Sequence, residues 1–337
     1  MTTPRDGLQK GVPMMDLDSE QMKVVYYPDS SVCIAGPGSG KTRVLTAKAE
    51  KLSSEGADLI CLTFTRSAAQ EIRDRIPGIP AGTIHSFCHS VMGWNQDTEY
   101  EGLLTDFLQK GKDKFDWVLV DEVQDLTDVQ LQVVLSLVGD KLFAVGDPYQ
   151  SIYGYGGALG MTAIRLLQDQ GCIPFDLKNN YRSVPEVVRK LNRIYERGLV
   201  SRGSKINGLT AVLTRSNEGV RGISEILKGK GIGHLVRSGS RDLSVRKEED
   251  YGSRNIQVST IHMAKGLEFD NVILFDWYPG KQVGEERNVY YVAASRASLK
   301  FIEVGWEKEL LSELEKLFEI LPPIALKRVR IVKRRVG

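Results

Sequence analysis

The sequence predicts an α/β protein with parallel sheets flanked by helices. Short apolar runs rich in β-branched residues, such as Ser31–Ala35 and Asp116–Asp121, alternate along the chain with segments of helical periodicity. The first run continues through a glycine-rich loop into the helical pattern Lys41–Ser53, the kind of crossover that parallel strands require. A chain of 337 residues is long enough for about two such domains.

The expected elements divide into two halves of similar construction. In the first half we expect strands at Ser31–Ala35, Asp58–Thr63, Asp116–Asp121 and Lys141–Gly146, and helices at Lys41–Ser53, Ser67–Ile76, Thr127–Val138 and Ala158–Gln168. In the second half we expect strands at Phe175–Leu177, Thr210–Thr214, Asn255–Ser259, Asn271–Phe275 and Leu299–Val304, and helices at Pro185–Tyr195, Glu218–Lys228, Glu286–Arg296 and Glu307–Glu319. The mixed-charge stretch Ser238–Arg254 lacks an apolar period and is expected to be a solvated loop.

These patterns also set the expected domain boundaries. Residues 1–11 are expected to be a flexible N-terminus and residues 12–171 the first domain, with a small insertion at about 93–115. Residues 172–321 are expected to form the second domain, and residues 322–337 a basic tail. The end of that tail carries six positive charges and no negative ones, so it either contacts phosphates or only aids solubility.

Composition excludes several classes of protein. Hydrophobic residues make up 42% and charged residues 26% of the chain, which excludes disorder throughout. No apolar run approaches the roughly 18 residues of a membrane span, and the first ten residues lack the apolar stretch of a secretory signal. The four cysteines lie far apart, which argues for reduced thiols and against a zinc site or a disulfide framework, so we expect a cytoplasmic protein.

A glycine-rich loop connects the expected strand Ser31–Ala35 to the helix that begins at Lys41. This is the context of a P-loop, in which backbone N–H groups and a helix N-terminus surround phosphate oxygens. Lys41 would reach the β- and γ-phosphates of ATP, and Thr42 would bind Mg²⁺. Ala35 stands where the strict pattern has glycine, and a glycine-rich turn that binds no nucleotide is the alternative. The residues of this loop are Ala35, Gly36, Pro37, Gly38, Ser39, Gly40, Lys41 and Thr42.

An acidic end on a buried strand is the second feature that ATP hydrolysis requires. The apolar residues 118–120 are followed directly by Asp121 and Glu122. Asp121 would bind Mg²⁺ directly or through water, and Glu122 would orient and deprotonate the attacking water. An ordinary strand end with exposed acids is the alternative.

Further short segments surround these two sites in a definite order. They are Thr63–Ala69, Gly82–Ser86, Asp121–Asp125 and Val145–Tyr153 in the first half, and Asn180–Ser183, Thr260–Phe269 and Tyr291–Ala297 in the second. In this order and spacing, the chain closely resembles superfamily 1 DNA helicases of the UvrD, Rep and PcrA type over about residues 17–304. The resemblance implies two RecA-like P-loop domains with ATP bound between them.

The resemblance also implies roles for side chains around ATP. Gln21 matches a glutamine that reads the adenine edge, and Tyr181 an aromatic residue that stacks on adenine. Glu268 matches an acidic contact near the ribose and γ-phosphate. Arg182 and Arg296 match two arginines that act at the γ-phosphate. The alternatives are surface ion pairs for these two arginines and a core position for Tyr181. The implied catalytic residues are Lys41, Asp121, Glu122, the γ-phosphate sensor Gln150 and the inserted arginines Arg182 and Arg296. The implied metal ligands are Thr42 and Asp121. The implied nucleotide-binding residues are Gln21, the loop residues 35–42, Arg43, Tyr181 and Glu268.

A second set of residues matches positions that contact single-stranded DNA in these helicases. The set is Phe64, Thr83, His85, Tyr153, Tyr155, Thr260 and His262. Stacking on aromatic rings tolerates any base and contributes about 1–3 kcal/mol per base. The two Thr-Ile-His triplets would each place a hydroxyl and an imidazole at the start of a helix, where they hold the DNA backbone. Core positions for the aromatic residues, and structural or metal-binding roles for the histidines, are the alternatives.

The sequence departs from the family in three respects. Only about residues 93–115 and 198–254 are available for the accessory domains of larger members, so we expect a compact motor core. Gly156 stands where the family usually has arginine, and Ser295 where it usually has threonine. Residues 93–115 would form either an aromatic wedge at the DNA fork or a helix packed on the core. The aromatic residues of that segment are Trp94, Tyr100, Phe107 and Phe115.

We therefore expect an ATP- and Mg²⁺-dependent translocase on single-stranded DNA that is also a DNA helicase. The segments Gln150–Tyr153 and Lys265–Glu268 resemble the branch that moves 3′ to 5′. The expected partners are single-stranded DNA and duplex junctions, with a protein partner for processive unwinding. The expected process is DNA repair or replication. We expect a monomer with no membrane association and no fused nuclease. The alternatives are a DNA-stimulated ATPase that remodels protein–DNA complexes but unwinds poorly alone, and a nucleotide-gated DNA-binding subunit.

Overall fold

The computed structural model describes residues 17–93, 102–110, 114–203, 206–239, 246–252, 255–275 and 285–320. The chain forms two compact units. The first unit comprises Met1–Gly208, Ala264–Asn271 and Lys281–Lys300, and the second comprises Leu209–Met263, Val272–Gly280 and Phe301–Gly337. Among the described helices, none combines the length and the apolar character needed to cross a membrane.

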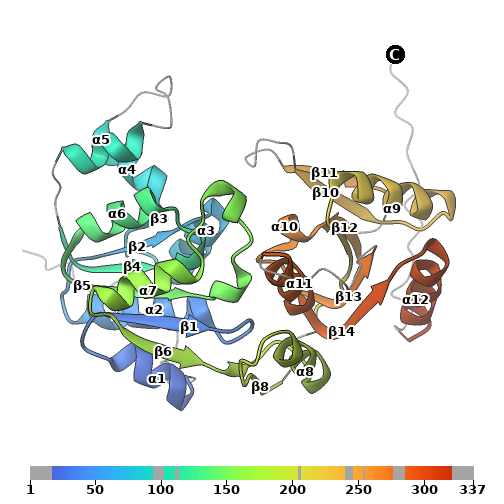
Figure 1. Ribbon diagram of the computed structural model, residues 1–337, viewed down its shortest axis with the longest axis horizontal. Helices are drawn as coiled ribbons and strands as arrows, with labels where there is room; N and C mark the ends of the chain where they lie inside the picture. The colour runs from blue at the N-terminus through green and yellow to red at the C-terminus, as the bar shows by residue number, and fades with distance from the viewer. Residues whose placement is uncertain are drawn as a thin grey trace, which may run out of the picture. The chain divides into compact units, whose positions relative to one another are not determined.

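The first unit contains a six-stranded sheet in the order β3-β2-β4-β5-β1-β6, and every neighbouring pair of strands is parallel. Figure 1 shows this sheet with its helices. The strands are β1 (Ser31–Ala35), β2 (Leu59–Thr63), β3 (Ala81–Thr83), β4 (Phe115–Val120), β5 (Val138–Gly146) and β6 (Ile173–Leu177). The helices are α1 (Ser19–Tyr26), α2 (Lys41–Ser54), α3 (Arg66–Arg75), α4 (Ile84–Met92), α5 (Leu103–Gln109), α6 (Asp128–Ser136) and α7 (Met161–Asp169).

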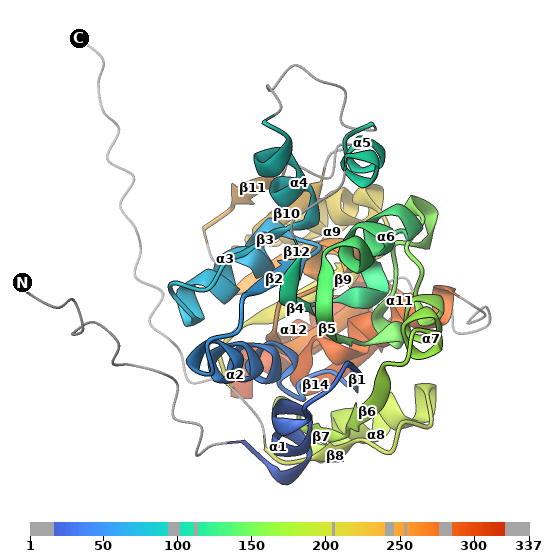
Figure 2. The ribbon, with the colours of Figure 1, turned by 90° about the vertical axis from the view of Figure 1, so that its left-hand side faces the viewer.

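Successive residues of the central strands face opposite sides of this sheet, as the β-strand period of two requires. Val118 and Val120 of β4 belong to a core cluster that includes residues of α4 to α7, whereas Leu119 belongs to a second cluster with residues of α1 to α3. Figure 2 shows α1, α2 and α3 on one side of the sheet and α6 and α7 on the other. Burial on both faces explains why these strands are continuously apolar rather than alternating.

Lys48 of α2 is a buried cation that holds the end of α1 in place. Its Nζ donates hydrogen bonds to the carbonyl oxygens of Val24, Val25 and Tyr27, at 3.4, 3.3 and 2.8 Å. The ammonium also lies 4.9 Å from the centre of the Trp117 ring. The last carbonyls of a helix have no partner within it, so these bonds satisfy groups that burial would otherwise leave unpaired. Burial lowers the pKa of Lys48 to about 8.

Strand β6 corrects one expectation from the sequence. Phe175–Leu177 was expected to be a strand of the second half, but β6 pairs in parallel with β1 along its whole length and forms an edge of the first sheet. The first unit also contains β7 (Asn179–Asn180), β8 (Val200–Ser201), α8 (Pro185–Ile194) and α11 (Glu285–Ser295). Both helices were expected within one residue of these bounds.

The second sheet has the order β11-β10-β12-β9-β13-β14. Strand β12 pairs in parallel with β9 and β10, and β11 pairs antiparallel with β10. A core cluster joins residues of this sheet to α9 and α12. The elements are β9 (Thr210–Thr214), α9 (Asn217–Gly229), β10 (Leu235–Gly239), β11 (Arg246–Asp250), β12 (Ile256–Thr260), α10 (Ile261–Ala264), β13 (Phe269–Phe275), β14 (Ala297–Val304) and α12 (Glu307–Ile320).

Strand β11 is the second correction, because Ser238–Arg254 was expected to be a loop. Its residues are all charged, which removes the apolar alternation by which strands are recognised in a sequence. The antiparallel pairing with β10 and an ion pair of 3.1 Å between Arg237 Nε and Glu248 Oε1 hold it at the edge of the sheet. The predicted α/β class with two sheets flanked by helices is nevertheless confirmed.

The segment 93–115 contains a helix that the sequence had offered as one of two alternatives. In α5, Leu103, Leu104 and Phe107 are buried, and Phe107 and Phe115 both contact Phe87 of α4 edge to face. This part of the segment is therefore packed on the core. Trp94 and Tyr100, like residues 1–11 and the basic tail 322–337, lie outside the described residues.

Candidate ATPase site and nucleic-acid-facing residues

The loop after β1 has the geometry of a phosphate cradle. Gly38 and Gly40 have φ angles of +67° and +86°, a region that residues with a Cβ rarely adopt. The loop leads into α2, whose N-terminus has no side-chain cap and no acidic residue in its first turn. Lys41, Thr42 and Arg43 form that first turn and are half-buried. An uncapped helix N-terminus beside a lysine is suited to bind phosphate oxygens.

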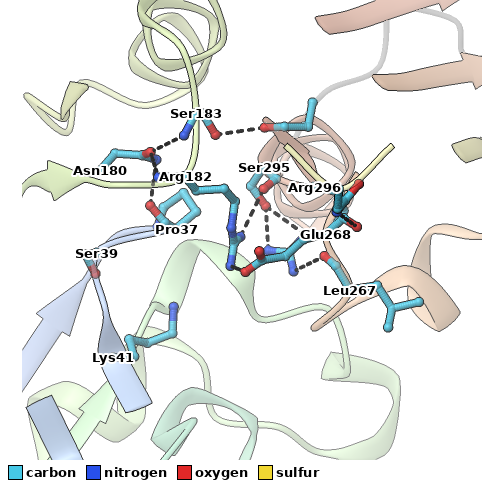
Figure 3. Close-up of polar contacts among 12 residues, drawn as sticks. Pro37, Ser39, Lys41, Asn180, Arg182, Ser183, Leu267, Glu268, Ser295 and Arg296 are labelled. Atoms are coloured by element: carbon cyan, nitrogen blue, oxygen red, sulfur yellow. Dashed lines mark hydrogen bonds and ion pairs between the residues drawn. The ribbon is translucent and has the colours of Figure 1, made fainter. Parts of the chain in front are cut away.

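Side chains from the loop and from the segment after β6 are closely packed. Ser39 Oγ donates to the Gly36 carbonyl oxygen at 2.7 Å, and Asn180 Nδ2 donates to the Pro37 carbonyl oxygen at 2.7 Å (Figure 3). A Cβ on Gly38 would lie 2.6 Å from Arg182 Cβ, so this approach requires glycine. Lys41 Nζ is 3.4 Å from the Ala35 carbonyl oxygen.

Gln21, expected to read adenine, is held at the edge of this cradle. Its side chain forms a capping box with Asp18 at the start of α1, and its Nε2 donates to the Ser39 carbonyl oxygen at 2.8 Å. Asp18 also accepts hydrogen bonds from Asn179 Nδ2, at 3.0 Å, and from the hydroxyl of Tyr181. Tyr181 remains 41% exposed, so its ring is accessible to a base, and Gln21 and Tyr181 are linked through one carboxylate.

The acidic pair lies at the end of β4 in contrasting electrostatic states. Burial, and then repulsion from Glu122, raise the pKa of Asp121 to about 7. Burial would also raise the pKa of Glu122, but the charges of Lys41 and Lys265 outweigh it and hold that pKa below its usual value. Glu122 has a φ of +52°, the one positive value among the described non-glycine residues. Such strain at a charged strand end is typical of functional sites.

Gln124 joins the ends of β4 and β5. Its Nε2 donates to Glu122 Oε2 at 2.6 Å, and its Oε1 accepts from the backbone N–H of Asp147 at 2.9 Å. A Cβ on Gly146 would lie 2.3 Å from Gln124 Oε1, so the glycine leaves room for this bridge. No role was expected for Gln124 from the sequence, although its position within Asp121–Asp125 was a usable signal.

Gln150 is buried and is bonded on three sides. Its Nε2 donates to Asp147 Oδ2 at 2.8 Å, and its Oε1 accepts from Arg296 Nη2 at 2.7 Å. Its carbonyl oxygen accepts from Lys265 Nζ at 2.8 Å. Arg296 is 3% exposed, and burial followed by repulsion from Arg182 lowers its pKa to about 9. The predicted sensor and one of the predicted arginines are therefore in direct contact.

The second arginine forms an ion pair with the predicted acidic contact. Arg182 Nη2 lies 2.5 Å from Glu268 Oε1, and Arg182 Nη1 donates to the Ser295 carbonyl oxygen at 3.3 Å (Figure 3). The Ser295 hydroxyl accepts from Arg296 Nη2 at 2.8 Å. A threonine at position 295, as is usual in the family, would offer the same hydroxyl.

Lys265 begins the segment Lys265–Glu268, but no contact of its own was expected from the sequence. Its Nζ lies 2.7 and 2.5 Å from the two carboxylate oxygens of Asp125 and 4.8 Å from the centre of the Tyr153 ring. Asp125 is buried, and burial raises its pKa to about 6 even though Lys265 acts in the opposite direction. One ammonium therefore contacts Asp125, which lies three residues after the acidic pair, the backbone of Gln150 and an aromatic residue expected to face DNA.

The three aromatic residues expected to stack on DNA lie next to one another. The rings of Phe64 and Tyr153 are 5.7 Å apart, and those of Tyr153 and Tyr155 are 6.3 Å apart. Tyr155 is 66% exposed, whereas Phe64 and Tyr153 are half-buried. Gly156, where the family usually has arginine, lies in the same exposed turn, and the backbone N–H of Gly154 there donates to Glu285 Oε1 at 3.1 Å.

The two Thr-Ile-His triplets occupy equivalent places in the two units. Thr83 ends β3 and accepts a hydrogen bond from the Ser86 N–H at the start of α4. Thr260 ends β12 and accepts one from the Met263 N–H of α10. Each histidine, His85 and His262, is half-buried in the first turn of the helix that follows. Burial lowers the pKa of His85, which favours the neutral imidazole.

The residues present fit ATP and a divalent cation. The cradle offers backbone donors and Lys41 to phosphates, and burial followed by repulsion from Glu122 raises the pKa of Asp121. A cation bound beside Asp121 would oppose both effects and stabilise the carboxylate. No cluster of three or more His, Cys, Asp or Glu side chains suited to a metal occurs in the described part of the chain, so such a cation would need oxygens from Thr42 and the phosphates.

Two family models match parts of the chain. Residues 20–156 match the AAA domain family, and residues 240–302 match the UvrD-like helicase C-terminal domain. The chain belongs to the UvrD-like superfamily 1 helicases. The P-loop ATPase domain of this family implies that the cradle binds ATP.

The chain is also similar to individual proteins. The chain is 25% identical to DNA helicase II of Escherichia coli (strain K12), over 56% of this chain and 42% of that protein. It is 25% identical to a probable DNA helicase of Mycoplasma pneumoniae (strain ATCC 29342 / M129 / Subtype 1), over 57% of this chain and 44% of that protein. A solved structure of two coordinating Pif1 helicases is 15% identical with a TM-score of 0.48, covering 90% of this chain and 97% of that one. The chain thus spans less than half the length of the two curated relatives.

Proposed function

We propose that this UvrD-like chain is an ATP- and Mg²⁺-dependent translocase on single-stranded DNA and a DNA helicase that moves 3′ to 5′. One observation carries the ATPase part: within the first unit, Gln150 joins the buried strand end beside the acidic pair to Arg296. A side chain so placed can transmit the state of a bound γ-phosphate to an arginine that is distant in sequence. The relatives named as DNA helicases support DNA as the substrate.

In this proposal the chain's own residues share the work of hydrolysis. Lys41 and the N-terminus of α2 bind and orient the phosphates, while Thr42 and Asp121 hold Mg²⁺, which neutralises charge on the phosphoryl oxygens. Glu122, kept ionised by the charges around it, accepts a proton from the attacking water. Arg182 and Arg296 stabilise negative charge that develops in the transition state.

We further propose that adenine stacks on Tyr181 and is read by Gln21, and that Glu268 and Arg43 complete the nucleotide site. Single-stranded DNA would stack on Phe64, Tyr153 and Tyr155, and the DNA backbone would contact the two Thr-His pairs, Thr83 with His85 and Thr260 with His262. We keep two proposed RecA-like domains, but move the expected boundary at residues 171 and 172 to after β6, because β6 pairs with β1 in the first sheet. The exposed Tyr155 and the half-buried Tyr153 beneath it support such a stacking surface.

One observation favours the alternative of a translocase that unwinds poorly alone. Unwinding requires a rigid element at the fork. Two aromatic residues of the segment 93–115 pack on the core of the first unit and are not available to form such an element. Phe107 is fully buried, and Phe115 packs against the same core cluster. A protein partner or several copies of the chain would then be needed to separate long duplexes.

ATP turnover measured with and without single-stranded DNA tests the proposed function. We expect hydrolysis that DNA stimulates, because hydrolysis in this proposal requires the two RecA-like domains to close on ATP, and DNA that binds both domains shifts the population towards that closed state. Glu122→Gln should lower turnover by about 10²–10⁴-fold and leave ATP binding nearly unchanged. Glu55→Gln, which alters an exposed carboxylate paired with Lys51, is the matched control. Turnover that DNA leaves unchanged would reject the motor and favour a nucleotide-gated binding subunit.

The direction of movement is tested by displacement of streptavidin from biotinylated single strands. Movement from 3′ to 5′ should displace streptavidin from the 5′ end and not from the 3′ end. Displacement from the 3′ end alone would reverse the assignment, and displacement from neither end would remove the translocase part of the proposal.

A further inference from the structure

Arg197 is a buried cation outside the two regions that match known families. It lies in the turn after α8, and only 7% of its surface is exposed. Its Nη1 donates to Asp147 Oδ1 at 2.8 Å, and Asp147 is fully buried. The guanidinium also lies over the Tyr149 ring, 4.6 Å from its centre. A buried carboxylate needs a partner of opposite charge, and Arg197 supplies it.

Asp147 connects Arg197 to the predicted γ-phosphate sensor. Asp147 Oδ1 accepts from Arg197, and Asp147 Oδ2 accepts from Gln150 Nε2 at 2.8 Å. An ionised carboxylate only accepts hydrogen bonds, so it must face the amide nitrogen of Gln150 and not the amide oxygen. The oxygen of that amide then points the other way, where it accepts from Arg296 Nη2 at 2.7 Å.

The orientation of this amide decides whether Arg296 has an acceptor. If the amide turned over, Gln150 would present its NH₂ group to a guanidinium, and two donors would face each other. A neutral group at position 147 could either donate or accept, and would allow both orientations. The charge on Asp147 removes that freedom only while the carboxylate faces Gln150, and the ion pair with Arg197 holds it in that position.

We propose that Arg197 is a positioning residue: by balancing the charge of Asp147 it sets the amide orientation of Gln150, and through Gln150 the placement of Arg296. This inference rests on the proposed function, because it assumes that Gln150 and Arg296 respond to a γ-phosphate. Among the described residues, the ion pairs of Arg197 are with Asp147 and, at 3.6 Å, with Asp176 of β6, and neither of these residues belongs to the cradle or the acidic pair. Its effect should therefore be confined to ligands that carry a γ-phosphate.

The test compares the affinities of the full chain for ADP and for a non-hydrolysable ATP analogue. Arg197→Met should weaken binding of the analogue by about tenfold, the loss of one hydrogen bond to a charged group, and leave ADP binding within twofold. Arg197→Lys retains the charge and should preserve most of the preference for the analogue. Arg193→Met, which alters an exposed arginine of α8, is the matched control and should change neither affinity.

The double variant Arg197→Met with Asp147→Asn separates positioning from stability. It removes the unpaired buried charge, so its thermal unfolding temperature should recover relative to Arg197→Met alone. An asparagine can donate or accept, so the preference for the analogue should stay low. A preference that recovers together with the unfolding temperature, or that Arg197→Met leaves unchanged, would overturn the inference and make Arg197 a purely structural residue.

The outcomes also distinguish this inference from the proposed function. A parent protein that hydrolyses ATP, but whose preference for the analogue does not depend on Arg197, rejects the inference alone. A parent protein that does not hydrolyse ATP, but whose preference depends on Arg197, rejects the proposed function alone. A parent protein with no preference for the analogue over ADP rejects the inference, because it has no γ-phosphate sensor for Arg197 to position.

Discussion

Two glycines with nearly the same backbone conformation allow the phosphate cradle to be tested against a matched control. Gly40 in the cradle has a φ of +86°, and Gly56 after α2 has a φ of +85°. An alanine at either position would incur the cost of a left-handed conformation, about 1–2 kcal/mol. A Cβ at Gly56 would meet nothing within 4 Å, whereas a Cβ at Gly40 would lie 2.9 Å from Gln21 Nε2.

The difference between the two variants measures what the cradle adds. Alanine at position 40 must displace the Gln21 amide from its 2.8 Å hydrogen bond to the Ser39 carbonyl oxygen. Loss of this buried bond costs about 1–3 kcal/mol. We therefore expect Gly40→Ala to be less stable than Gly56→Ala by that amount in urea unfolding, and to bind ATP about tenfold more weakly. Equal stabilities together with equal ATP affinities would refute the assigned cradle.

Three further predictions concern charged and aromatic side chains. Lys265→Met should leave Asp125 buried without its partner and lower the free energy of unfolding in urea by about 3–5 kcal/mol. The same variant should lower the DNA stimulation of ATP turnover more than the basal rate of turnover. Normal stimulation would contradict the link between Lys265 and Tyr153. Burial lowers the pKa of Lys48 to about 8, whereas the unfolded chain keeps its proton up to about 10.5, so the unfolded state binds more protons between these values. The stability of the parent relative to Lys48→Met should therefore rise by roughly 3 kcal/mol from pH 8 to pH 10.5, and a difference that stays constant with pH would show that the Lys48 pKa is not lowered. Tyr155→Ala should change the free energy of unfolding by less than about 0.5 kcal/mol and weaken binding of single-stranded DNA by about 1–3 kcal/mol. It should also reduce strand separation more than ATP hydrolysis. Equal losses in both activities would place Tyr155 outside the DNA path.

Sequence patterns predicted most of the sheet and much of the candidate site. The strand Ser31–Ala35 and the helix beginning at Lys41 were located correctly, because a mostly apolar run and a glycine-rich loop are local signals. Asp121 and Glu122 were identifiable because they directly follow a buried strand. Each of these features is read within a few consecutive residues.

Elements without a local signal were missed or misplaced. The charged strand β11 resembles a solvated loop because its stability comes from pairing with β10, not from an apolar face. Strand β6 was assigned to the wrong half because a strand's sequence does not specify its neighbour, and β1 is separated from β6 by the whole series of intervening strands and helices. Pairing between strands depends on the completed sheet.

The sequence alone determined which chemical groups the chain carries at the ends of its strands: the cradle, the acidic pair, the sensor and the two arginines. The tertiary structure decided which of them meet. Arg197 binds a carboxylate 50 residues away, and Lys265 binds one 140 residues away. A single arginine or lysine has no pattern that marks its partner, because an ion pair needs only that two side chains arrive at the same place. Where they arrive is set by burial of both faces of the sheet, which is a property of the folded chain as a whole.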